Sequence, residues 1–150
     1  MGFRTMRTDI RRLLLFSAVL WFAGCAQLPP SPADIQAKKF EAVPDRAVIY
    51  IVRSDPDFSR DPATLLLDDT HMIATYPGTY YRWEAAPGAH HIAGYAADAG
   101  ITTLNVEAGK IYYVQQSFVP GPFTPRSWFN LLTPEAGRSL VMRGELVGGK

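Results

Sequence analysis

The stretch RAVIYIVR, residues 46–53, decides the fold class of this 150-residue chain. Between its two arginines stand only alanine, valine, isoleucine and tyrosine. β-Branched and aromatic residues favour strands, and a continuous apolar run of this length is typical of a strand buried on both faces. The sequence therefore predicts a β-strand over 46–53 that is buried on both faces.

Short apolar segments continue the β pattern on the C-terminal side of this strand. The expected strands cover 63–69, 71–76, 79–86, 89–97, 101–109, 110–119 and 127–133. Turn signals such as Pro77-Gly78 and Pro87-Gly88 recur about every ten residues, which is the spacing of an antiparallel sandwich or barrel. No long helical crossover separates the segments, so a parallel sheet is not expected. We therefore expect an all-β fold, a single antiparallel β-sandwich of about seven strands.

One helix is predicted, at the C-terminal end of the domain. Thr133 is a suitable N-cap, Pro134 suits the first helical position, and Glu135 favours the positive end of the helix dipole. This short C-terminal helix should run to about Met142 and end at Gly144.

The first two dozen residues have the pattern of a secretory signal peptide. Four arginines precede a run at 13–22 that is apolar except for Ser17, and Ala23 and Gly24 then lead to Cys25, the only cysteine. A basic region, a short apolar region and small residues at a cleavage site make up such a signal. The run is shorter than the ~20 residues of a transmembrane helix.

The segment Phe22-Ala23-Gly24-Cys25 resembles the bacterial lipobox. The resemblance implies diacylglycerol transfer to the Cys25 thiol, cleavage before this residue, and acylation of the new amino terminus. Ala26 follows in place of an aspartate, which implies sorting to the outer membrane. Several acyl chains give stable attachment, whereas one gives only marginal binding. An ordinary buried cysteine and an intermolecular disulfide are the alternatives.

These features divide the chain into a signal peptide (1–24), a lipidated, proline-rich tether (25–44) and a β-sandwich domain (45–150). The whole chain has 15 basic and 14 acidic residues. Removal of four arginines and Asp9 with the signal leaves 11 basic and 13 acidic residues. This balance argues against nucleic-acid binding, which needs clustered Lys and Arg.

No motif nominates a catalytic or metal site. Adjacent His90 and His91 should point to opposite faces of a strand, and a His71–His90 pair lacks further ligands at a diagnostic spacing. The loop DPDFSRD (55–61) starts like a calcium loop but lacks the glycine and glutamate of an EF-hand. G-x-S-x-G and P-loop motifs are absent. We expect neither an enzyme nor a bound metal, and no cofactor beyond the lipid on Cys25.

The abundant aromatic residues suggest two candidate binding surfaces. In 79–86, Tyr81, Trp83 and Ala85 alternate with a second face that holds Tyr80 and Arg82. If that second face is outward, Tyr80 and Arg82 would be placed to stack on a sugar or a partner side chain. The loop PGPFTPRSW (120–128) would present Phe123 and Arg126. Ordinary core packing and a rigid turn are the alternative explanations.

Short turn and core motifs are spread along most of the domain. In chain order they are Ala37-Lys38-Lys39-Phe40, Pro44, Ala47, Ile49-Tyr50, Arg53, Leu67-Asp68-Asp69, Gly78-Thr79-Tyr80, Pro87-Gly88-Ala89-His90 and Ala108-Gly109-Lys110-Ile111-Tyr112-Tyr113. Together they resemble the bacterial lipoprotein family of domain of unknown function 2846, over about 40–140. The resemblance implies a small β-sandwich similar to PEGA-type modules and supplies no catalytic residues. Asp45 stands where the family pattern would have a glycine.

The expected protein is an envelope lipoprotein anchored on the periplasmic side of the outer membrane. Its domain should act as a non-catalytic binding or scaffolding module for another envelope protein. A glycan or small-ligand binder that uses the Tyr80/Arg82 face is the alternative, and an envelope hydrolase has no residues to support it.

Overall fold

The computed structural model describes residues 29–148. The elements in chain order are α2 (Pro32–Ala37), β1 (Ala47–Arg53), β2 (Ala63–Leu67), β3 (His71–Thr75), β4 (Thr79–Ala85), β5 (Gly88–Gly94), β6 (Ile101–Val106), β7 (Ile111–Val119), β8 (Arg126–Leu131), α3 (Pro134–Arg143) and β9 (Glu145–Leu146). No helix among these residues is long and apolar enough to cross a membrane.

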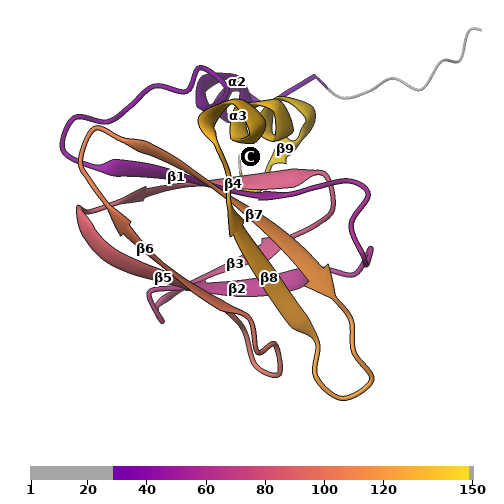
Figure 1. Cartoon of the computed structure of the whole chain (residues 1–150). Helices are drawn as coiled ribbons and strands as arrows, with labels where there is room; N and C mark the ends of the chain where they lie inside the picture. The colour runs from indigo at the N-terminus through magenta and orange to yellow at the C-terminus, as the bar shows by residue number, and fades with distance from the viewer. Residues whose placement is uncertain (1–28, 149–150) are drawn as a thin grey trace, which may run out of the picture.

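The strands form two sheets, so the predicted all-β sandwich is confirmed (Figure 1). One sheet has the order β8-β7-β1-β4-β9 and the other the order β3-β2-β5-β6. The described residues hold nine strands rather than about seven.

Two of the strand pairings, β1 with β7 and β4 with β9, are parallel. These two pairs depart from the purely antiparallel pairing that the sequence predicts, whereas the other five strand pairings are antiparallel. Parallel strands need a crossover. Here the chain between β1 and β7 runs through β2 and β3 of the other sheet, back to β4, and again through β5 and β6 of the other sheet, without a helix.

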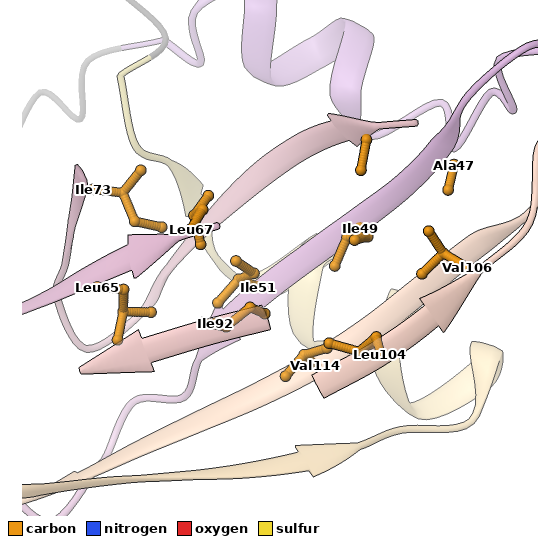
Figure 2. Packing of buried hydrophobic residues seen from close by; sticks show 11 residues of the cluster. Ala47, Ile49, Ile51, Leu65, Leu67, Ile73, Ile92, Leu104, Val106 and Val114 are labelled. Atoms are coloured by element: carbon orange, nitrogen blue, oxygen red, sulfur yellow. The ribbon is translucent and has the colours of Figure 1, made fainter. Parts of the chain in front are cut away.

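The main core lies between the two sheets. Side chains of β1, such as Ile49 and Ile51, meet Leu65, Leu67 and Ile92 of the opposite sheet (Figure 2). Alternation along β4 places Tyr81 and Trp83 against this same cluster, as predicted. All seven residues of β1 are buried, which confirms the strand with two covered faces.

A second core covers the outer side of the five-stranded sheet. The sheet contributes three tyrosines and two valines, Tyr50, Tyr80, Tyr113, Val48 and Val52. Ala37 of α2 and Val141 of α3 pack on them from the helices. The predicted caps of α3 are present: the Thr133 side chain accepts from the Ala136 N–H, and Gly144 ends the helix. Gly137 is required on the inner side of α3, because a Cβ there would lie 2.1 Å from the Tyr113 ring.

Helix α2 belongs to the folded domain, although its residues were expected to form part of the tether. Ser31 caps the helix by accepting from the Asp34 N–H. The buried Asp34 carboxylate then accepts from the Leu146 N–H at 2.9 Å and from the Tyr80 hydroxyl at 2.9 Å. The packed domain therefore begins before the predicted boundary at residue 45.

Candidate functional site

The outer side of the five-stranded sheet is covered over only part of its area. The register pairs Val52, in the second core, with Gln115 of β7, so the alternate β7 residues Gln115, Ser117 and Val119 share this outer side. Their partners on β8 are Asn130, Trp128 and Arg126. Both helices lie toward the other end of the molecule (Figure 1), and these strand residues remain uncovered.

The uncovered part of the sheet contains a shallow depression of about 360 Å³. Its lining residues are Ser54, Pro56, Asp57, Phe58, Gln115 and Ser117. Phe58 is 75% exposed on the β1 side of the depression, and Trp128 is 54% exposed on β8, beside Ser117. Phe58 lines the depression itself, and Trp128 adjoins it as the β8 partner of the lining residue Ser117. The depression therefore has one exposed aromatic side chain in its lining and a second beside it.

We call this surface the open face and define it by six residues: Ser54, Phe58, Gln115, Ser117, Arg126 and Trp128. Its floor is ordered internally, because the Gln115 amide donates to the Ser54 hydroxyl at 2.9 Å. The amide oxygen of Gln115 and the hydroxyl of Ser117 have no partner among the recorded hydrogen bonds of the described residues. The floor therefore offers neutral donors and acceptors to a ligand.

The loop that carries Phe58 is held by a buried arginine. Arg53 is 1% exposed, and its Nε lies 2.6 Å from Asp57 Oδ2. Its other nitrogens donate to the carbonyl oxygens of Ser59 at 2.7 Å and Asp61 at 2.8 Å. Phe58 thus projects from between two residues that Arg53 holds in place. Asp57 and Asp61 serve the fold, since the Asp57 carboxylate is buried against Arg53 and the Asp61 carboxylate accepts from the Ser59 hydroxyl.

Arg126 and Phe123 were predicted as binding residues, and both are exposed. The Arg126 guanidinium lies over the Trp128 ring, 4.8 Å from its centroid, which orients the indole on the open face. Phe123 is 93% exposed in the β7–β8 loop. Among residues 29–148, the recorded ion pairs include none with Arg126.

The predicted Tyr80/Arg82 face is wrong as an exposed surface. Tyr80 is fully buried, because α2 packs over this part of β4. Burial and the neighbouring Asp34 carboxylate raise the pKa of its hydroxyl. Arg82 is partly buried beside a groove of about 540 Å³ next to α2, where it pairs with Glu84. Strand β4 is separated from β8 by β1 and β7, so the four predicted binding residues do not form one site.

The histidines occupy structural positions around the β2–β3 turn. His90 Nδ1 lies 2.6 Å from Asp68 Oδ2, and His91 Nε2 lies 2.9 Å from Asp69 Oδ2. Burial disfavours the charged imidazole of His90, but bonds to Asp68 and to the Ala86 carbonyl outweigh this and raise its pKa. In the part of the chain that the structure describes, no group of three or more potential ligands is placed to hold a metal ion.

A buried polar chain closes the edge of the sandwich next to the open face. Thr75 donates to Gln116, Gln116 donates to Ser127, and the Ser127 hydroxyl donates to Asp98. Asp98 also accepts from the backbone N–H of Ser127 at 2.6 Å. This N–H would otherwise be free at the edge of the sheet, so Asp98 blocks part of β8 against strand addition.

Sequence reasoning did not single out Phe58 or Trp128, the exposed aromatic residues at the open face. Their exposure was the missing signal, because it depends on which strand residues the helices cover. No family model matches the chain, and no curated protein matches it. The lipoprotein-family resemblance therefore stays a prediction, and the lipobox lies outside the described residues.

Proposed function

We propose that this protein is a lipoprotein of the bacterial envelope whose β-sandwich domain binds a partner and performs no catalysis. Lipid on Cys25 would hold the domain at the periplasmic side of the outer membrane. The lipobox-like segment and Ala26 support the anchor and its sorting. Helix α2 begins at Pro32, so the folded domain starts only a short way along the chain from the acylated residue.

The observation that carries the binding role is the open face. Its aromatic side chains are exposed, and Arg53 and Arg126 hold them in position. Surface loops on rigid scaffolds commonly carry binding sites. The described acidic groups with lowered pKa, Asp34 and Asp68, are each engaged in structural hydrogen bonds away from this depression.

The anchor is tested by metabolic labelling with palmitate, followed by separation of inner and outer membranes. The parent protein should carry label and sediment with the outer membrane. Cys25→Ser should carry no label and accumulate as a longer precursor. Ala26→Asp is the matched control, since it should keep the label and move to the inner membrane. Labelled Cys25→Ser protein would refute the assignment.

A further inference from the structure

We propose that the open face binds a glycan strand, and that Arg126 selects strands whose sugars carry carboxylate groups. This inference deepens the proposed function, because it names the ligand class of the binding face. It rests on that function for the location of the domain in the envelope.

The chemistry of the depression matches that of a sugar ring. A pyranose has an apolar face of C–H groups, which packs on an aromatic ring, and a rim of hydroxyl groups that require hydrogen bonds. Phe58 supplies exposed aromatic surface in the lining, and Trp128 supplies it next to the lining residue Ser117. Gln115, Ser117 and Ser54 supply amide and hydroxyl groups. Ligand sites generally combine aromatic walls with a few placed polar groups in this way.

The size of the depression favours a sugar over a protein partner. Its volume of about 360 Å³ lies within the range of small-ligand sites, roughly 300–1,000 Å³. A stable protein interface buries about 800 Å² on each partner and has an apolar centre. Here the lining includes the polar residues Ser54, Gln115 and Ser117. Strand addition is also disfavoured, because Asp98 occupies the Ser127 N–H at the β8 edge.

The charges around the depression indicate an anionic substituent on the sugar. Asp57 is the only acidic residue among the lining residues, and Arg53 neutralises it at 2.6 Å. Arg126 is exposed and forms no ion pair within residues 29–148. Its guanidinium is oriented by the Trp128 ring and keeps its donors available, and such a planar group binds carboxylates in a bidentate manner.

The test is calorimetric titration of the full-length lipidated protein, in detergent, with two tetrasaccharides. One is the neutral tetramer of N-acetylglucosamine, and the other has the same length but carries lactyl carboxylates on alternate sugars. The parent should bind both, the carboxylated one at least tenfold more tightly. Trp128→Ala and Phe58→Ala should each weaken both interactions at least tenfold. Trp128→Phe should restore most of the affinity.

Arg126→Gln separates the two parts of the proposal. It should abolish the preference for the carboxylated tetrasaccharide, so that the two sugars bind with similar affinity. Because the Arg126 guanidinium also contacts the Trp128 ring, binding of the neutral sugar should weaken, but much less than in Trp128→Ala. Met72→Ala is the control. Met72 is 58% exposed on the other sheet, so this variant should bind both sugars as the parent does. Failure of the parent to bind either sugar at millimolar concentration, or unchanged binding by Trp128→Ala, would overturn the glycan assignment. Equal affinities for the two sugars would overturn the role of Arg126. Palmitate labelling is independent of all these outcomes, so the anchor stands or falls separately.

Discussion

Replacement of Arg53 by leucine should lower the free energy of unfolding by about 3–5 kcal/mol. The Asp57 carboxylate, with a side chain 2% exposed, would lose the guanidinium that lies 2.6 Å away. Removal of one partner from a buried ion pair leaves an uncompensated charge, and this cost exceeds that of losing the attraction alone.

Arg53→Leu also removes the other hydrogen bonds of Arg53, and opening of the loop limits how much their loss costs. Its guanidinium also donates to the carbonyl oxygens of Ser59, Asp61 and Thr75. Each bond from a charged donor contributes about 1.5–3 kcal/mol, so a simple sum would exceed the ion-pair figure. The carbonyls of Ser59 and Asp61 belong to the 54–62 loop, however, and can turn toward water if it opens. Opening should therefore limit the loss and release Phe58.

Urea unfolding followed by tryptophan fluorescence measures the free energy, and amide exchange at 57–61 reports loop opening. Arg60→Leu is the matched control, since Arg60 is exposed in the same loop and should change stability by less than about 0.5 kcal/mol. Combination of Arg53→Leu with Asp57→Leu should recover part of the loss, but not all of it, because the Phe118 N–H would lose its acceptor, Asp57 Oδ2. A loss below about 1 kcal/mol for Arg53→Leu alone would refute this reasoning.

Two further predictions concern packing and pH. Gly137→Ala should lower the melting temperature, although alanine is normally better than glycine in helices by about 1 kcal/mol, because its Cβ would lie 2.1 Å from the Tyr113 ring. Ser139→Ala on the exposed side of α3 should not lower it, and a more stable Gly137→Ala protein would contradict the close approach. The raised pKa of His90 means that its ion pair with Asp68 stabilises the fold fully below the ordinary histidine pKa of about 6.5, and that this contribution is lost as pH rises through the raised value. The stability difference between the parent and His90→Asn should accordingly be larger at pH 5.5 than at pH 9, and an unchanged difference in urea unfolding would exclude this coupling.

The parts of the fold that sequence predicts well are those with local causes. Strand β1 is buried on both faces because its apolar residues 47–52 leave no side to face water, and the final residue, Arg53, is buried in its own ion pair. Helix α3 starts and ends as expected because Thr133, Pro134 and Gly144 act on adjacent backbone groups. Neither prediction requires knowledge of a distant partner.

The burial of Tyr80 shows where local reasoning stops. Alternation along β4 correctly separates Tyr80 from Tyr81, but it does not say which side faces water. That side is covered because Asp34 of α2 accepts from Leu146, 112 residues later in the chain. In sequence, α2 follows prolines and has the composition of a tether, so its contact with the sheet leaves no local pattern.

The open face exists because the two helices are shorter than the sheet that they cover. Helix α3 has ten residues, so it is about 15 Å long, and α2, with six residues, is shorter still. Strand β7 alone has nine residues and spans about 30 Å. The two helices therefore cannot reach both ends of the sheet. The side chains change at this limit: Tyr113 is buried in the covered part of β7, whereas Gln115 and Ser117 continue the same side into the open face. Trp128, the large aromatic residue in that polar region, has no core to fill there, which is why we assign it to a ligand.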